Sequence, residues 1–224
     1  MRRGLRRCPR RVAVALVLAV SPWPLAAAEV AGTVTAPSSV RPKPPPRYYM
    51  GPERSGRGAT GARGGVEDVV VWLEGVDGEV RVEPPPPPAV MRQLDEAFLP
   101  HVLPVRAGGA VEFPNDDDYY HNVFSVMAGD RFDLGRYARG ESSRQTFTTS
   151  GVVVVRCEIH PGMKAFVRVL DGPAFTVPAA DGGFLFSGLA AGTYTVRAWH
   201  PTAGERSHTV TVAADGTARV ALDF

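Results

Sequence analysis

The chain has 224 residues, with 25 Lys and Arg against 23 Asp and Glu, and it contains only two cysteines. This nearly even balance of charge gives no sign of a nucleic-acid partner. Glycine and proline together make up about a fifth of the residues, which favours many turns over long helices and predicts one large or two small turn-rich domains.

The first 28 residues have the organisation of a secretory signal peptide. Six arginines lie within residues 1–11, an apolar run follows at 12–20, and residues 25–28 read Leu-Ala-Ala-Ala. This order is typical of a signal that is cleaved, here after Ala28. The apolar run is shorter than the roughly 18 residues expected of a membrane-spanning helix. We therefore expect a periplasmic or otherwise exported protein with no transmembrane segment after cleavage.

Cleavage at this point would change both the charge and the cysteine count. Without the six arginines, 19 basic residues remain against 23 acidic ones, a net charge of −4, which argues further against nucleic acid. Cys8 would leave with the signal, so Cys157 would be the single cysteine of the mature chain. A lone cysteine in an exported chain can be reactive, paired with another chain, or bound to a metal.

Short valine-rich runs bounded by Gly, Pro and Asp predict the strands of an all-β fold. They lie at residues 30–34, 66–73, 102–105, 111–113, 151–156, 166–170, 184–186, 193–199, 209–212 and 217–224. Residues 91–98 can form one or two helical turns at most. Residues 37–65 are built mainly from Pro, Gly, Ser and Arg, which predicts a disordered insertion. The five prolines at 84–88 predict a stiff spacer.

Composition changes near Gly172, where a second unit is expected to begin. The turn signal Asp181-Gly182-Gly183 is followed by strand-like runs. Residues 183–200, Gly-Phe-Leu-Phe-Ser-Gly-Leu-Ala-Ala-Gly-Thr-Tyr-Thr-Val-Arg-Ala-Trp-His, resemble the carboxypeptidase-regulatory-like or transthyretin-like β-sandwich. This resemblance implies binding or scaffolding rather than chemistry. A unit of this size has a marginal core, so we expect it to pack on the larger domain.

Two other segments, residues 113–125 and 152–163, carry the residues that can hold a metal. The candidate ligands are His121, Cys157, His160 and Met163. Each segment follows a strand-like run, so both can lie on loops at the same end of a sandwich. A thiolate and two imidazoles bind a late first-row metal ion strongly, and a weak thioether contact is characteristic of blue-copper sites. The sequence therefore predicts one mononuclear copper ion as the cofactor.

The same residues resemble the plastocyanin and amicyanin group of cupredoxins over residues 66–170. His121-Asn122 resembles the first-ligand segment of that group, and Cys-x-x-His-Pro-x-Met at 157–163 resembles the short ligand loop of amicyanin. The resemblance implies a cupredoxin-like Greek-key β-sandwich or barrel. It also implies that His121, Cys157 and His160 are equatorial ligands, that Met163 is axial, and that Asn122 ties the two ligand loops together by hydrogen bonds.

The expected organisation has three parts: a signal peptide at 1–28, a copper domain at 29–170 that contains the insertion at 37–65, and a small β-sandwich at 171–224. With its insertion and appended unit, the whole chain resembles proteins labelled methylamine-utilisation proteins. Redox partner proteins are expected from the resemblance, but no motif in the sequence identifies them.

We predict a periplasmic blue-copper protein that transfers single electrons and is not an enzyme. The alternative is a copper-binding or storage module without a redox role, with the C-terminal sandwich as an interaction module. An enzyme with Cys157 as nucleophile lacks an orienting acid, and a structural zinc site needs no methionine. The acidic run at 116–118 is expected to be a solvated rim. His101, His200 and His208 are expected to have structural roles only.

Overall fold

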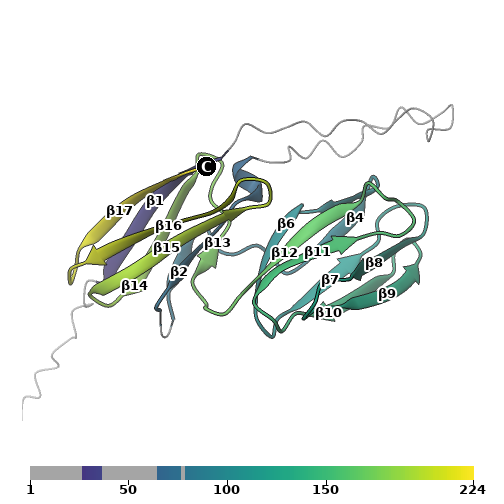
Figure 1. Cartoon of the computed structure of the whole chain (residues 1–224), viewed down its shortest axis with the longest axis horizontal. Helices are drawn as coiled ribbons and strands as arrows, with labels where there is room; N and C mark the ends of the chain where they lie inside the picture. The colour runs from purple at the N-terminus through teal and green to yellow at the C-terminus, as the bar shows by residue number, and fades with distance from the viewer. Residues whose placement is uncertain (1–26, 37–64, 77–78) are drawn as a thin grey trace, which may run out of the picture.

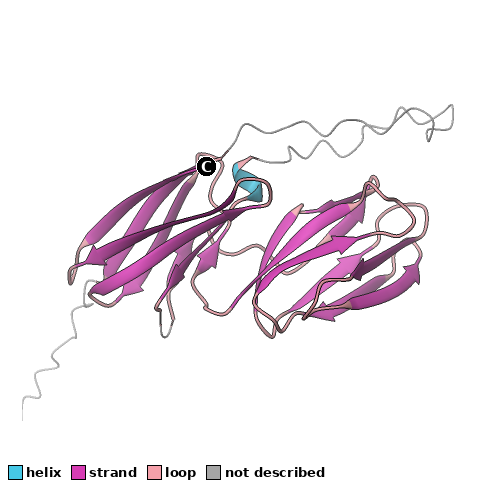
Figure 2. Ribbon diagram, viewed as in Figure 1, coloured by secondary structure: helices cyan, strands magenta, loops and turns pink. Residues whose placement is uncertain are grey.

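A computed structural model describes residues 27–36, 65–76 and 79–224, and within these ranges the chain is built almost entirely from strands (Figures 1 and 2). It contains seventeen strands there and one short 3-10 helix, η2 (Val66–Asp68). The all-β prediction is therefore confirmed. Most of the expected signal peptide at 1–28 and of the expected insertion at 37–65 lies outside the described residues.

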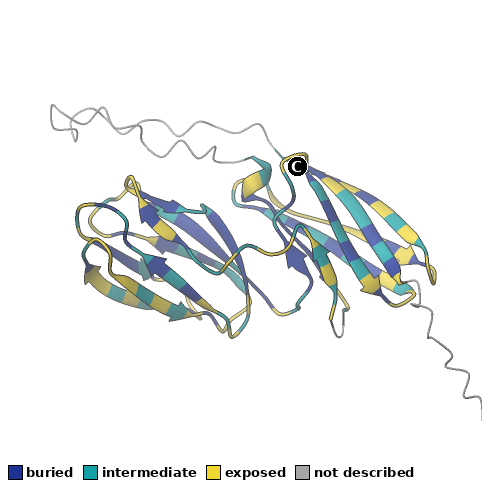
Figure 3. Cartoon of the chain, turned by 180° about the vertical axis from the view of Figure 1, so that it is seen from behind, coloured by how far each residue is buried: buried dark blue, intermediate teal, exposed yellow. Residues whose placement is uncertain are grey.

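One β-sandwich, here called the split sandwich, is made from both ends of the chain. Its two sheets have the orders β17-β1-β14-β3 and β13-β2-β15-β16. The strands are β1 (Ala28–Thr35), β2 (Val70–Glu74), β3 (Arg81–Glu83), β13 (Phe175–Thr176), β14 (Gly183–Leu189), β15 (Gly192–His200), β16 (Gly204–Val212) and β17 (Thr217–Asp223). Alternate residues of β15 are buried (Figure 3), as expected for a strand with one face on the core. The core includes Val30, Phe186 and Val196.

The chain between β3 and β13 forms a second sandwich, here called the inserted sandwich. Its main sheet has the order β6-β12-β11-β8-β9, accompanied by the pairs β10-β7 and β4-β5. The strands are β4 (Arg92–Leu94), β5 (Ala97–Leu99), β6 (Val102–Arg106), β7 (Ala110–Pro114), β8 (His121–Ser125), β9 (Phe132–Tyr137), β10 (Ser142–Thr146), β11 (Gly151–Arg156) and β12 (Lys164–Leu170). Its core contains Phe98, Phe113 and Phe147 together with Cys157 and Met163.

The pairing of β1 and β2 corrects the domain boundaries expected from the sequence. Both strands were expected in a copper domain at 29–170, apart from a sandwich at 171–224. In the structure, β1 lies between β14 and β17, and β2 pairs with β15. The physical reason is burial, because the strands after residue 171 need β1 and β2 to cover their apolar faces and to occupy their open edges.

Residues 91–98 form the β4–β5 hairpin rather than helical turns. Asp95 and Glu96 make its two-residue turn with φ values of 53° and 56°, the left-handed conformation that such hairpin turns require. Met91 and Phe98 on either side are completely buried in the inserted sandwich. The expected strand at 66–73 also begins later, because residues 66–68 form η2 before β2 starts at Val70.

The two sandwiches meet in a third apolar cluster, which joins Val70 and Trp72 of β2 and Phe175 of β13 to Val102, Phe166 and Leu170 of the inserted sandwich. The ring of Phe166 packs edge-on against Trp199 with centroids 5.8 Å apart. Arg168 lies over the Trp72 ring at 4.6 Å. The two sandwiches thus share an apolar contact, although neither has the boundaries expected from the sequence.

Candidate metal centre

Strand topology brings the candidate ligands to one end of the inserted sandwich. β8 and β11 are antiparallel neighbours, paired at Phe124 and Arg156. The start of β8 and the end of β11 therefore lie at the same end of the sheet. His121 is the first residue of β8 and Cys157 directly follows β11, so the two side chains meet although they are 36 residues apart.

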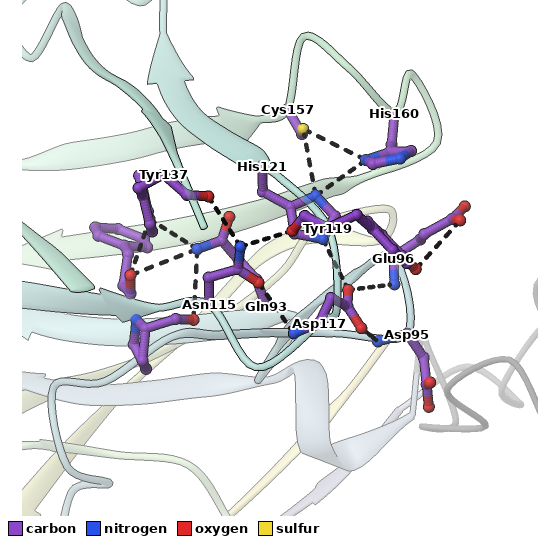
Figure 4. Close-up of polar contacts among 12 residues, drawn as sticks. Gln93, Asp95, Glu96, Asn115, Asp117, Tyr119, His121, Tyr137, Cys157 and His160 are labelled. Carbon is purple, nitrogen blue, oxygen red and sulfur yellow. Dashed lines mark hydrogen bonds and ion pairs between the residues drawn. The ribbon is translucent and has the colours of Figure 1, made fainter. Parts of the chain in front are cut away.

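His121, Cys157 and His160 converge on one point (Figure 4). The Sγ atom of Cys157 lies 3.8 Å from Nδ1 of His121 and 3.8 Å from Nδ1 of His160. The two Nδ1 atoms are 2.9 Å apart. All three donor atoms therefore lie within 4.8 Å of one another.

The loop after β11 is closed by its own backbone. The N–H of Cys157 donates to the carbonyl of Met163 at 3.3 Å, and the N–H of Met163 donates to the carbonyl of His160 at 2.9 Å. Met163 is 1% exposed and belongs to the same core cluster as Cys157. The fourth candidate ligand is thus a buried residue at the end of the same loop.

Asn122 joins the two ligand segments, as the resemblance implied. Its Oδ1 accepts a hydrogen bond from the backbone N–H of Glu158 at 2.6 Å. Its own backbone N–H donates to the sulfur of Cys157. Because Asn122 bonds to both Cys157 and Glu158, it fixes the position of the His121 segment relative to the Cys157 loop.

The surroundings of Cys157 favour its thiolate form. Burial raises the pKa of the thiol, but hydrogen bonds from the His121 side chain, the backbone N–H groups of Asn122 and His160, and the His160 ring together lower it to about 6. For His121, burial lowers the pKa, whereas contacts with Cys157 and Asp117 raise it above its ordinary value overall. A thiolate is the form of cysteine that binds metals.

Asp117 is a site residue that the sequence interpretation missed. It was expected to belong to a solvated acidic rim at 116–118, but it is 6% exposed and its Oδ2 lies 2.7 Å from Nε2 of His121. Asp116 instead pairs with Arg92, and Asp118 pairs with Arg139. The expected rim is therefore neutralised by arginines.

Tyr119 is a second residue that sequence reasoning did not select. Its ring centroid lies 5.2 Å from that of His121 and 5.4 Å from that of His160. Its hydroxyl donates to Glu96 at 3.3 Å. The ring of Tyr119 therefore packs against both histidines, of which His121 is fully buried and His160 is half-buried.

The remaining histidines lie apart from this group. His101 contacts Asp68 at 2.8 Å at the junction of the sandwiches. Nδ1 of His200 accepts backbone hydrogen bonds from Thr202 and Ala203 at the end of β15. His208 lies on an exposed position of β16. None of the three lies within the group formed by His121, Cys157 and His160.

The donor set fits a copper ion. Two imidazole nitrogens and a sulfur that is readily deprotonated are the ligands that late first-row metals prefer, and a nearby methionine suits copper in particular. Nε2 of His121 is engaged by Asp117, so Nδ1 is the nitrogen left to face the sulfur. Within the described ranges of the chain, this is the one group of three converging His, Cys, Asp or Glu side chains.

Known proteins provide an independent comparison. No protein-family model matches the chain. Plastocyanins from Ulva arasakii and Ulva pertusa are each 36% identical to it over 84 residues, which cover 33% of this chain and 86% of the plastocyanin.

Two solved structures are also similar. A copper-containing nitrite reductase from Thermus scotoductus is 29% identical with a TM-score of 0.36, over 44% of this chain and 24% of that one. The chain thus spans about a quarter of that enzyme. A mutant of amicyanin in its reduced state is 21% identical with a TM-score of 0.35, over 42% of this chain and 100% of amicyanin. Since the plastocyanins are matched over most of their length, this chain belongs to the cupredoxin family.

Proposed function

We propose that the inserted sandwich binds one copper ion through His121, Cys157 and His160, with Met163 as the axial ligand, and that the protein transfers single electrons. The observation that carries this proposal is the convergence of the Cys157 sulfur and both Nδ1 atoms in one group, in which Cys157 and His121 are buried and His160 is half-buried. Bound copper would supply a one-electron couple between its two oxidation states. The relation to plastocyanin supports the same metal and the same use.

The protein's own residues favour a site that changes little between oxidation states. The backbone bonds within the loop at 157–163 and the Asn122 bridge hold the donors in place without a metal. A set of donors that is already arranged limits the rearrangement that accompanies gain or loss of an electron. This property distinguishes an electron carrier from a storage module, for which flexible donors suffice.

A path for electrons to the surface is supported by His160. This residue is half-buried, and its neighbour Ile159 is 36% exposed. Tyr120, next to His121, is 59% exposed. An apolar surface beside a ligand allows a redox partner protein to approach closely while water is excluded. Which protein docks there would be found by cross-linking the copper form in extracts of its native compartment.

The deciding experiment is spectroscopy and voltammetry of the copper-loaded protein. The proposal expects an intense visible absorption band, one copper per chain and a reversible one-electron wave. Cys157→Ser, which removes the sulfur with little change in volume, should be colourless. Binding of cuprous ion without a visible band in the oxidised form and without a reversible wave would support the storage alternative instead.

We also infer export from the cell and a relation of the split sandwich to the carboxypeptidase-regulatory-like or transthyretin-like fold. The arginine-rich start and the short apolar run support export. Within the described ranges, no helix is both long and apolar enough to cross a membrane. The second inference is supported by the motif at 183–200, which falls on β14 and β15. N-terminal sequencing of the protein from its native host would test cleavage after Ala28.

A further inference from the structure

Asp117 links the candidate ligand His121 to a turn on the surface (Figure 4). Its Oδ2 lies 2.7 Å from Nε2 of His121. Its Oδ1 accepts the backbone N–H of Asp95 at 2.7 Å, and its Oδ2 also accepts the backbone N–H of Glu96 at 3.0 Å. Three donors thus occupy both oxygens of one buried carboxylate, which leaves the side chain a single orientation.

This arrangement determines which nitrogen of His121 is available. An ionised carboxylate can only accept hydrogen bonds, so Nε2 of His121 must carry a proton. The other nitrogen, Nδ1, then faces Cys157 and His160. Hydrogen-bond partners of this kind orient metal-ligating histidines and increase their basicity.

The position of Asp117 is itself fixed by hydrogen bonds from its neighbours. Oδ1 of Asn115 accepts the backbone N–H of Asp117 at 3.0 Å, while its Nδ2 donates to the carbonyls of Tyr119 and Tyr137. Asn115 is completely buried. On the other side, Asp95 and Glu96 have positive φ, an unfavourable conformation for residues with a side chain. Asp117 compensates for this by bonding to both of their N–H groups.

We propose that Asp117 is a positioning residue of the copper centre. It fixes the ring of His121 with Nδ1 directed at the other ligands before metal binds, and its negative charge lowers the reduction potential of the bound copper. The reason for the second effect is electrostatic, because an anion next to a ligand favours the more positively charged state of the metal. This inference rests on the proposed copper function.

The experiment compares Asp117→Asn with Asp118→Asn in the copper-loaded full chain. Asp118 is the matched control, since it lies in the same acidic run but is 65% exposed and pairs with Arg139. For Asp117→Asn we expect copper affinity to fall by about 10–100-fold. We also expect the equilibrium for reduction to shift about tenfold toward the reduced form, which for one electron corresponds to about 59 mV. Asp118→Asn should match the wild type in both, and equal behaviour of the two variants would overturn the proposal.

A second measurement uses the metal-free wild-type protein, so it requires neither bound copper nor a correctly folded variant. In the metal-free wild type, the proton on Nε2 of His121 should give a low-field NMR signal that exchanges slowly with water. A fast-exchanging or unprotonated Nε2 would refute the positioning role. If the signal is present but the copper form is neither coloured nor reversibly reducible, the proposed function fails. In that case the hydrogen bond from Nε2 of His121 to Asp117 exists, but the proposal that it positions a copper ligand is overturned together with the proposed function.

Discussion

The two sandwiches differ in where they bury polar groups. Of the ten buried polar or charged residues in the described part of the chain, seven lie in the inserted sandwich. Gln93, Asn115, Asp117, His121 and Asn122 belong to these seven, and their side chains gather beneath or beside the candidate ligands. The other three are Asp68, which pairs with His101 at the junction of the sandwiches, and Thr176 and His200 of the split sandwich, which bond to backbone groups of nearby segments.

Burying a polar group is unfavourable unless its hydrogen bonds are satisfied. A fold therefore tolerates a concentration of such groups where they perform a task that apolar residues cannot. In the split sandwich, the core is assembled from aliphatic and aromatic residues along its whole length. This contrast agrees with the proposed function, in which the inserted sandwich holds the metal and the split sandwich has no part in the chemistry.

Removal of the sulfur is the sharpest way to test this contrast. Cys157→Ser should weaken copper binding by more than about 100-fold, beyond the range typical of outer-shell changes, and should abolish the visible band. The reason is that the hydroxyl of serine is a poor substitute for a thiolate. Absorption and copper titration measure the effect, with circular dichroism to verify the fold. A variant that keeps the colour would show that Cys157 is not a ligand.

A cavity in the split sandwich should affect stability without changing the metal centre. Phe186 is completely buried there, and Phe186→Ala should lower the free energy of unfolding by about 3–5 kcal/mol. The folded fraction should keep the wild-type absorption band. Phe113→Ala is the matched control in the inserted sandwich, where the same loss of volume should also disturb the copper spectrum. The contrast breaks down if Phe186→Ala alters the band as strongly as Phe113→Ala.

A smaller substitution tests whether β1 belongs to the split sandwich. A Cβ added at Gly32 would lie 2.7 Å from the carbonyl oxygen of Val220 and would overlap the ring of Phe184. Gly32→Ala should therefore destabilise the protein by about 1–3 kcal/mol, measured by urea denaturation. At Gly172 the nearest atom would be 3.9 Å away, so Gly172→Ala serves as the control. Equal stability of the two variants would argue against the observed pairing of β1.

The smallest effect is a shift in one ionisation of the metal-free protein. Absorbance at the thiolate band should rise with a midpoint near pH 6, because hydrogen bonds outweigh burial and lower the pKa of Cys157 to about 6. The thiolate thus persists to a lower pH in the folded chain than in the unfolded one. Cys157→Ser should show no such step, and a midpoint at the ordinary pKa of a thiol would mean that the hydrogen bonds do not form.

The proposed ligand set can be read from the sequence because it is chemically rare and mostly local. Cys157, His160 and Met163 lie within seven residues, so a single loop presents all three. The strands are predictable as well, since valine-rich runs between turns have one favourable structure. The contact of Asp117 with His121 could not be predicted from the sequence, because three consecutive aspartates are equivalent until the fold of the loop buries one of them.

The sequence alone determined the fold class and supplied the proposed ligand types and their loop, because these depend on short-range pattern and side-chain chemistry. The tertiary structure decided which strands share a sandwich. Thr35 of β1 bonds to Asp223 of β17 across 188 residues, a distance over which no local pattern specifies a partner. Pairing at such separation is selected by the burial of complementary apolar faces, and this becomes apparent only when the whole chain is folded.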